Sequence, residues 1–395
     1  MPAALRTQVG IVGAGPAGLL LSHLLHLHGV ESIVVEMHTR DYVEHRIRAG
    51  LMEHFSVELL REAGVGARMD REGLVHHGIV LRFGGGSHRI PLTELSGGKS
   101  VMIYGQHEVV KDLIAARLTA GGQILFEAEA VGVHDISTDR PRLRFRHEGR
   151  AQELACDIIA ACDGFHGVCR PALPAGRLTV FDRVYPFGWL GILAEVAPSN
   201  DELVYANHAN GFSLLTMRSP AISRLYLQCA PDEDADAWSD DRIWTELQTR
   251  LSDDAGFVLK TGPILQKGVT AMRSYVVEPL RCGRLFLVGD AAHIVPPTGA
   301  KGMNLAFADV AVLSRALAEW YRTGNDEGLE NYSARALRRV WKAERFSWWL
   351  TTLMHKFDAH TPFERRMQQA ELDYVTSSRT AAAMLAENYV GLPLA

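Results

Sequence analysis

The stretch Gly13-Ala14-Gly15-Pro16-Ala17-Gly18 decides the fold of this chain. An apolar run at 7–12 precedes it, a run with helical apolar spacing covers 17–28, and a second apolar run covers 32–36. A strand, a glycine turn, a helix and a second strand form a βαβ unit, which implies a parallel sheet. Glycine lets the turn approach a pyrophosphate, and the helix start offers free N–H groups to the anion. Glu36, at the end of the second strand, can accept hydrogen bonds from a ribose, so we predict a dinucleotide site.

Two later stretches carry acidic residues directly after apolar strands. Asp163-Gly164 follows the predicted strand 154–162, and Gly289-Asp290-Ala291-Ala292-His293 follows the predicted strand 284–288. Each stretch alone is typical of a simple turn. Ligand contacts in α/β sheets gather where strands end, so the three stretches together indicate one dinucleotide site.

The rest of the chain divides by pattern. We predict a helix at 105–120, strands at 123–135 and 142–147, a helix at 241–252 within an otherwise antiparallel region, and helices at 300–323, 326–356 and 363–388. The predicted class is α/β. We expect a dinucleotide-binding domain over 1–180, which also contributes part of a substrate sheet near 77–100. A β-rich substrate module then covers 181–275, and 276–395 carries a strand, a loop and a helical region.

The composition excludes several classes of function. A net charge of −5 with no basic run argues against nucleic acid and anionic membranes as partners. The five cysteines lack C-x-x-C spacing, and the seventeen histidines show no metal-binding spacing. The apolar stretch 9–25 contains glycine and proline and lacks a cleavage site, so we do not interpret it as a signal peptide. We expect a soluble cytoplasmic protein without a metal.

The three fingerprints, in this order, resemble the flavoprotein aromatic hydroxylases that have a single dinucleotide-binding domain. The likeness is closest to the members that act on 4-hydroxybenzoate, and it extends over nearly the whole chain. It rests further on the stretches 46–50 (RIRAG), 185–191 (YPFGWLG), 205–208 (YANH), 283–304, 341–349 (WKAERFSWW) and 387–393 (ENYVGLP). The resemblance implies a bound FAD, a reduced nicotinamide that visits without a Rossmann domain of its own, O₂ as co-substrate, and a homodimer.

The resemblance also implies a reaction in aromatic catabolism. The expected substrate is 4-hydroxybenzoate and the expected product is 3,4-dihydroxybenzoate. Arg218 resembles the family's carboxylate clamp, with Tyr226 beside it, and Arg224 matches an arginine near the flavin and substrate. A guanidinium fork suits a carboxylate. The family usually has serine where this chain has Thr216, so related acids such as 4-aminobenzoate or 3,4-dihydroxybenzoate remain alternatives.

The catalytic residues come from the same resemblance. Tyr205 would hydrogen-bond the phenolate, Tyr389 would pass the proton onward, and His76 would exchange it with solvent near neutral pH. The Pro297 carbonyl would lie near the substrate hydroxyl. In the family the oxidant is a flavin C4a-hydroperoxide. The segment 296–304 opens a helix whose N–H groups would face the flavin.

The cofactor contacts fall into two sets. For FAD we expect Gly13, Gly15, Gly18, Glu36, Arg48, Gln106, Asp163, Asp290, Gly299, Gly302 and Asn304. For the nicotinamide we expect Arg46, His166, Arg170 and Arg273. The NADPH-preferring pattern has arginine directly after the glutamate, where this chain has Met37, although Arg40 and Tyr42 remain. A phosphate dianion favours a cationic fork, so we predict weakened NADPH selectivity and appreciable NADH use.

Two other classes of protein are alternatives to a hydroxylase. A flavin-dependent halogenase should carry a W-x-W-x-I-P signature, and the chain has none. A non-catalytic FAD-binding protein should lack the relay or the clamp. Both sets of residues are present, so a hydroxylase remains the predicted function.

Overall fold

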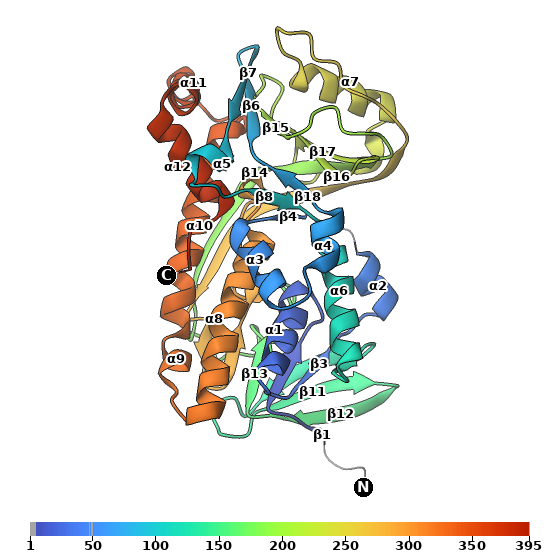
Figure 1. Cartoon of the computed structure of the whole chain (residues 1–395), viewed down its shortest axis with the longest axis vertical. Helices are drawn as coiled ribbons and strands as arrows, with labels where there is room; N and C mark the ends of the chain where they lie inside the picture. Colours follow the sequence, from blue (N-terminus) through green and yellow to red (C-terminus); the bar gives the residue numbers. More distant parts are fainter. Residues whose placement is uncertain (1–4, 47, 49, 395) are drawn as a thin grey trace.

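The fold is built around a six-stranded sheet that carries the glycine-rich turn (Figure 1). We describe it from a computed structural model, in which residues 5–46, 48 and 50–394 are described. The strand order is β19-β20-β13-β2-β3-β9, and every neighbouring pair from β20 to β9 is parallel. The strands are β2 (Val9–Val12), β3 (Ser32–Val35), β9 (Gln123–Leu125), β13 (Ile158–Ala161), β19 (Arg281–Cys282) and β20 (Leu285–Leu287).

Helix α1 completes the predicted βαβ unit. It spans Pro16–Leu27 and packs against both α6 (Gln106–Thr119) and α8 (Gly302–Thr323). All three helices were predicted, with ends displaced by one or two residues. Of the quoted stretch 46–50, Ile47 and Ala49 lie outside the described residues.

A four-stranded sheet lies at the lower end in Figure 1, in the order β1-β12-β11-β10. Its strands are β1 (Leu5–Arg6), β10 (Glu129–His134), β11 (Arg142–His147) and β12 (Arg150–Ala155). The single strand predicted over 154–162 is therefore wrong. The chain leaves this sheet at Cys156-Asp157, where the N–H groups of Asp157 and Ile158 both turn to the Gln8 carbonyl. The predicted strand 123–135 is likewise two strands, β9 and β10, in different sheets.

An eight-stranded sheet forms the upper half of the molecule, in the order β21-β18-β14-β17-β16-β15-β6-β7 (Figure 1). Its strands are β6 (Ile79–Phe83), β7 (Gly86–Ile90), β14 (Thr179–Ala194), β15 (Leu203–Ala206), β16 (Ser213–Ser219), β17 (Ile222–Cys229), β18 (Ile264–Glu278) and β21 (His293–Ile294). All pairs are antiparallel except β15 with β6. Because β14 and β18 both cross the proposed domain limits, those limits stay a prediction.

Shorter elements complete the fold, and the three short strands among them form a small antiparallel sheet of their own. The shorter elements are α2 (Arg40–His45), α3 (His54–Glu62), α4 (Ala67–Glu72), α5 (Leu92–Leu95), α7 (Asp240–Leu251), the strands β4 (Leu51–Met52), β5 (Leu74–His76) and β8 (Val101–Ile103), and the 3₁₀ turns η1 (Ala235–Ala237), η2 (Gly289–Ala291) and η3 (Pro297–Gly299). Helix α7 confirms the helix predicted at 241–252; the Ser239 side chain caps it by accepting from the Arg242 N–H.

The C-terminal region is helical, as predicted, but it is divided more finely. The predicted helix 326–356 is α9 (Glu327–Glu330) and α10 (Tyr332–Met354), separated at Asn331. The predicted helix 363–388 is α11 (Pro362–Ser377) and α12 (Arg379–Val390). Extended Ser378 separates the last two because its hydroxyl caps α12.

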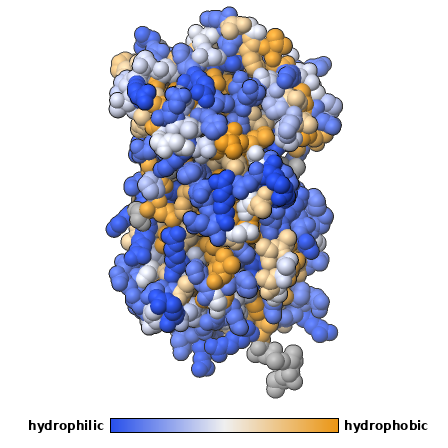
Figure 2. Space-filling model, in the orientation of Figure 1, coloured by the Kyte–Doolittle hydropathy of each residue, from blue (hydrophilic) through white to orange (hydrophobic). Residues whose placement is uncertain are grey.

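Within the described residues four apolar clusters follow this architecture, and two of them are large. One lies around the six-stranded sheet, and the other lies between the eight-stranded sheet and α10, α11 and α12. Polar residues cover most of the face in Figure 2, and apolar residues appear there in small separate groups. Within the described part of the chain, no helix combines the length and the hydrophobicity that a membrane crossing requires.

Candidate active site

The three sequence fingerprints follow three adjacent strands. The glycine turn follows β2, Asp163 follows β13, and Asp290 follows β20, so the carboxyl ends of parallel neighbours bring them together. The Arg170 guanidinium links the second fingerprint to the third, because it donates to the Ala291 carbonyl at 2.9 Å. The predicted meeting of the three stretches at one edge is confirmed.

The three glycines of the turn have different roles. Gly13 has φ +101°, and a Cβ there would lie 2.5 Å from the Cys162 carbonyl oxygen. A Cβ on Gly18 would lie 2.0 Å from the Gly13 carbonyl oxygen. A Cβ on Gly15 would meet nothing within 4 Å, and no side chain caps the helix start beside it. Gly13 and Gly18 therefore permit close packing, whereas Gly15 faces open space that fits a pyrophosphate.

Glu36 is held in a defined orientation at the end of β3. Its carboxylate accepts from the Ala14 N–H and from the His38 N–H, both at 2.8 Å. The side chain is buried. A carboxylate with fixed oxygens beside the glycine turn suits the ribose contact that the sequence predicts.

The other FAD residues surround the same edge. Asp163 accepts from the Cys169 N–H at 2.9 Å, and burial raises the pKa of its carboxyl. Arg46, Arg48 and Asp290 are exposed. Partial desolvation by the surrounding chain raises the pKa of the Asp290 carboxyl, and the positive charges of His293, Arg48 and Arg46 oppose this in part. This donor and acceptor set fits FAD.

The loop before α8 contributes backbone groups rather than side chains. Gly302 begins the helix, and a Cβ there would meet nothing within 4 Å. Gly299 instead packs closely, since its Cβ would lie 2.5 Å from the Ser347 hydroxyl. The Asn304 side chain is fully used inside the protein: it accepts from the Glu53 N–H and the Ser56 hydroxyl and donates to the Leu51 and Ala300 carbonyls. Any flavin contact of Asn304 would therefore come from its backbone N–H.

A buried charge cluster anchors this loop and was not predicted. The Lys301 ammonium bonds the Glu53 carboxylate at 2.6 Å and the carbonyls of Asn388 and Tyr389. Arg339 donates to the other Glu53 oxygen at 2.5 Å. The cluster ties the loop before α8 to the end of α12, and only these long-range partners distinguish Lys301 from an ordinary lysine.

The two predicted catalytic tyrosines meet. The hydroxyls of Tyr205 and Tyr389 are 2.7 Å apart, and the Tyr205 hydroxyl also lies 3.3 Å from the Thr298 carbonyl oxygen. Both rings are fully buried, and burial raises the pKa of both phenols. Pro297, next to Thr298, is exposed on the same loop. The pair can therefore exchange a proton with a phenol placed at this loop.

His76 shows a different environment from the one expected. It is buried on β5, burial lowers the pKa of its imidazole, and neither ring nitrogen has a hydrogen-bond partner among the described residues. The structure does not join it directly to the tyrosine pair. Its role as the solvent end of the relay stays a prediction.

The predicted carboxylate clamp forms on β16 and β17. Arg218 donates to the Met217 carbonyl at 2.9 Å and lies 3.5 Å from the Tyr226 hydroxyl, while its Nε has no partner within the described chain. Thr216, two residues earlier on β16, is paired in register with Arg224, whose guanidinium lies over the Tyr226 ring. Burial raises the pKa of Tyr226, but Arg218 and Arg224 outweigh it and lower the pKa overall. The site therefore holds concentrated positive charge that suits a carboxylate.

Two of the four predicted nicotinamide residues are engaged with the protein. Arg273 forms a two-point ion pair with Asp182, and Arg170 and Arg273 both lie over the Phe165 ring. His166 is exposed beside Phe165. The structure thus gathers Arg170, Arg273 and His166 around one aromatic ring, and their contact with a nicotinamide stays a prediction.

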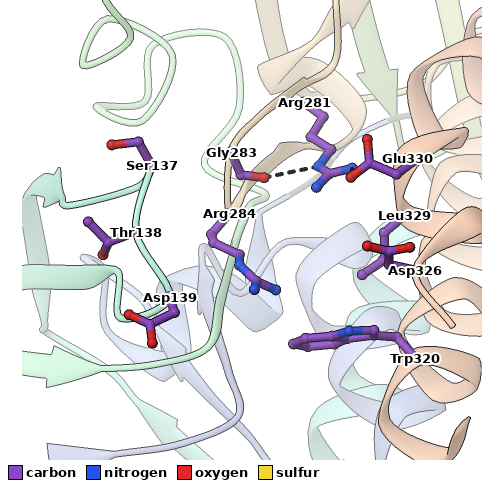
Figure 3. A pocket seen from close by; sticks show the side chains of 10 residues that line it. All are labelled: Ser137, Thr138, Asp139, Arg281, Gly283, Arg284, Trp320, Asp326, Leu329 and Glu330. Carbon is purple, nitrogen blue, oxygen red and sulfur yellow. Dashed lines mark hydrogen bonds and ion pairs between the residues drawn. The ribbon is translucent and has the colours of Figure 1, made fainter. Parts of the chain in front are cut away.

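A cavity of about 320 Å³ lies away from this site (Figure 3). It is polar, and one of its charges is already paired: Arg281 bonds Glu330 and the Gly283 carbonyl. Arg284 points toward Trp320, whose ring it covers at 4.9 Å. It contains none of the predicted site residues, so we do not place the chemistry there.

The site and fold define an FAD-dependent protein, and comparison with known proteins agrees. The family described as "FAD binding domain" matches residues 6–347. The chain is 49% identical to the p-hydroxybenzoate hydroxylase of Acinetobacter baylyi, over 98% of this chain and 96% of that protein. It therefore belongs to the flavoprotein aromatic hydroxylase family, and it is an enzyme that uses FAD.

More distant relatives share the architecture. A 3-(3-hydroxy-phenyl)propionate/3-hydroxycinnamic acid hydroxylase of Burkholderia cenocepacia is 26% identical over 79% of this chain and 57% of its own length. The solved structure of p-nitrophenol 4-monooxygenase from Pseudomonas putida superimposes with a TM-score of 0.84 at 18% identity, covering 98% of this chain and all of the other. That last likeness shows the fold, which is the predicted α/β class.

Proposed function

We propose that the enzyme hydroxylates 4-hydroxybenzoate to 3,4-dihydroxybenzoate, with NAD(P)H as reductant and O₂ as oxidant. The observation that carries the proposal is that two groups of polar residues suit the two ends of one substrate. Arg218 and Tyr226 form a cationic end, and the hydrogen-bonded pair Tyr205 and Tyr389 forms a phenol-accepting end. A 4-hydroxybenzoate molecule has a carboxylate and a phenol at its opposite ends, which complement these two groups of residues.

In this proposal the protein's residues position the substrate and move one proton. The Arg218 fork binds the carboxylate, and the Tyr205 hydroxyl receives the phenolic proton as its own proton passes to Tyr389. Loss of the phenolic proton makes the ring electron-rich at the carbon ortho to the phenol oxygen, where the new C–O bond forms. Bound FAD, once reduced by NAD(P)H, supplies the activation of O₂. FAD would be held by the glycine turn, Glu36, Asp163, Asp290 and the N–H groups that open α8.

Exposed side chains support proposals for the choice of reductant and for the oligomeric state. Met37 is exposed beside Glu36, so this position offers no cation to a 2′-phosphate, and we propose appreciable use of NADH. Phe363 and Met367, one turn apart on α11, are exposed apolar side chains that suit the proposed homodimer. The five free thiols and the use of a reduced nicotinamide fit a cytoplasmic enzyme.

The test is oxidation of NADH and NADPH by the FAD-loaded protein, with and without 4-hydroxybenzoate. We expect strong stimulation by the substrate, with 3,4-dihydroxybenzoate formed in proportion to the reductant consumed. Stimulation that yields mainly H₂O₂ would reject 4-hydroxybenzoate as the substrate and favour 4-aminobenzoate or 3,4-dihydroxybenzoate, the acids that Thr216 keeps open. Absence of stimulation by either reductant would reject the proposal at the substrate level.

A further inference from the structure

His355 follows the last turn of α10 and is completely buried. Its Nδ1 lies 2.9 Å from the Thr351 carbonyl oxygen, which can only accept a hydrogen bond. Its Nε2 lies 2.7 Å from the indole N–H of Trp189, which can only donate. Both contacts are satisfied together by one form alone, the neutral imidazole protonated on Nδ1. Burial lowers the pKa of this imidazole to about 3, so the form persists at neutral pH.

Trp189 links His355 to the substrate clamp. Its ring lies 4.9 Å, between centroids, from the ring of Tyr226, whose hydroxyl faces Arg218. Phe212 packs against His355 at 4.4 Å, against Trp189 at 5.2 Å and against Tyr205 at 6.1 Å. The His355 imidazole therefore packs behind an aromatic wall formed by Trp189 and Phe212. This wall connects the clamp to the proton-accepting tyrosine.

The same turn of α10 is bonded to the loop before α8. The Thr351 hydroxyl donates to the Thr298 hydroxyl at 2.9 Å, and the Thr298 carbonyl accepts from Tyr205. His355 is bonded to the Thr351 carbonyl. A continuous path of contacts thus runs from Tyr205 through Thr298, Thr351 and His355 to Trp189. It joins the two ends of the proposed substrate pocket across four separate segments of the chain.

We propose that His355 is a positioning residue for hydroxylation: by holding the Trp189 indole N–H, it fixes the aromatic wall against which the substrate ring is aligned between clamp and flavin loop. This inference rests on the proposed function. A substrate ring that is held loosely would still bind and still stimulate reduction, but its carbon ortho to the phenol oxygen would meet the oxidant less often. The wasted reductant would then appear as H₂O₂.

The experiment compares two amide replacements that separate the two nitrogens. His355→Gln places a carbonyl oxygen where Nε2 lies and can still accept from Trp189. His355→Asn places an N–H where Nδ1 lies and keeps only the bond to Thr351. Trp189→Phe removes the donor while leaving His355 intact, and His28→Asn, at an exposed position on the FAD domain, is the control. For each FAD-loaded variant we would measure melting temperature, substrate dissociation constant, kcat, KM, and the ratio of 3,4-dihydroxybenzoate to H₂O₂.

We expect His355→Asn and Trp189→Phe each to raise the H₂O₂ share and the substrate dissociation constant by about fivefold, the size of one lost hydrogen bond. His355→Gln should recover most of the coupling, and the double variant His355→Asn/Trp189→Phe should be no worse than either single one, because both remove the same bond. Equal losses in His355→Gln and His355→Asn would overturn the proposal, since the ring rather than the bond would then matter. Unchanged coupling in a folded His355→Asn protein would overturn it as well.

The proposed function and this inference can fail separately. If the wild-type protein forms no product from any benzoate, the proposed function is rejected. The inference is then judged on the dissociation constants of the same acids, followed through the flavin absorption spectrum. Higher dissociation constants for His355→Asn and Trp189→Phe than for His355→Gln and the wild type would support it, and equal constants for all four proteins would reject it.

Discussion

The hydroxyl oxygens of Tyr205 and Tyr389 lie 2.7 Å apart, on β15 and α12, and no polar side chain other than these two is bonded to either within the described residues. Each phenol therefore depends on the other for its side-chain hydrogen bond. The Tyr205 hydroxyl also lies 3.3 Å from the Thr298 carbonyl oxygen, and its single proton can go to that carbonyl or to Tyr389, one at a time. We therefore expect the proton of a bound phenol to leave along the two tyrosines.

Replacing Tyr389 with phenylalanine removes the second member of that route. We expect Tyr389→Phe to lower kcat at least about tenfold, the lower range of a lost proton-transfer group, while KM changes little. Steady-state kinetics with 4-hydroxybenzoate would measure both constants. Tyr374→Phe, at a position that is 55% exposed, is the matched control and should leave both unchanged. A Tyr389→Phe enzyme with normal kcat would show that the proton leaves by another path.

Arg218 should be far more sensitive to a conservative change than a surface arginine. Arg218→Lys keeps the charge but removes the planar fork, so we expect the dissociation constant for 4-hydroxybenzoate to rise about tenfold or more. Titration followed through the flavin spectrum measures this constant. Arg140→Lys, at an exposed turn, is the control. Equal affinities for wild type and Arg218→Lys would place the carboxylate elsewhere.

Gly15 and Gly18 offer a test that separates cofactor binding from folding. Because a Cβ on Gly15 meets open space, Gly15→Ala should fold with an unchanged melting temperature when FAD is removed, yet bind FAD at least about tenfold more weakly. In Gly18→Ala the new Cβ collides with backbone, so the protein itself should lose stability. Fluorescence titration with FAD and thermal unfolding of the apoprotein distinguish the two effects. An unchanged FAD affinity in Gly15→Ala would show that the pyrophosphate does not bind at this turn.

Met37 should control the choice of reductant. Met37→Arg restores a cation next to Glu36, and we expect the ratio of kcat/KM for NADPH to that for NADH to increase about tenfold or more. Val258→Arg adds the same charge at a remote position that is 77% exposed and should not change the ratio. A wild-type preference for NADPH of about a hundredfold, or about 2.7 kcal/mol, would contradict our interpretation of Met37.

Glu344 should make the protein less stable as pH rises. Burial raises the pKa of its carboxyl to about 7, an effect that Ser274 and His293 oppose only in part. Between the unfolded pKa, near 4.5, and pH 7 the folded state keeps a proton that the unfolded state releases, so stability falls across this window and then levels off. Glu344→Gln should match the wild type near pH 4.5 and exceed it by about 2 to 3 kcal/mol at pH 8.

Denaturant unfolding of both proteins at the two pH values checks this expectation. Glu31→Gln, at an exposed position, is the control for loss of a surface charge. A stability difference that is the same at pH 4.5 and pH 8 would mean that folding does not raise the pKa of Glu344.

Local rules account for the parts of the fold that were predicted well. Gly13 requires a positive φ, and the apolar runs on either side have the spacing of a strand and a helix, so the βαβ unit could be inferred without any distant contact. The errors occurred where the chain passes from one sheet or helix to the next. At Cys156-Asp157 and at Ser378 the local pattern is continuous, and the break is set by which neighbours accept the backbone N–H groups.

The site shows the same division. The sequence by itself determined which residue types are present: a glycine turn with an acidic partner, two tyrosines in matching motifs, and an arginine suited to a carboxylate. Only the tertiary structure decided that β13 lies between β2 and β20, that Asn304 is saturated by protein partners, and that Lys301 and His355 are buried in fixed hydrogen bonds. Backbone conformation and periodicity depend on near neighbours in the chain. The partner of a buried polar group comes from packing between distant segments, which no local pattern encodes.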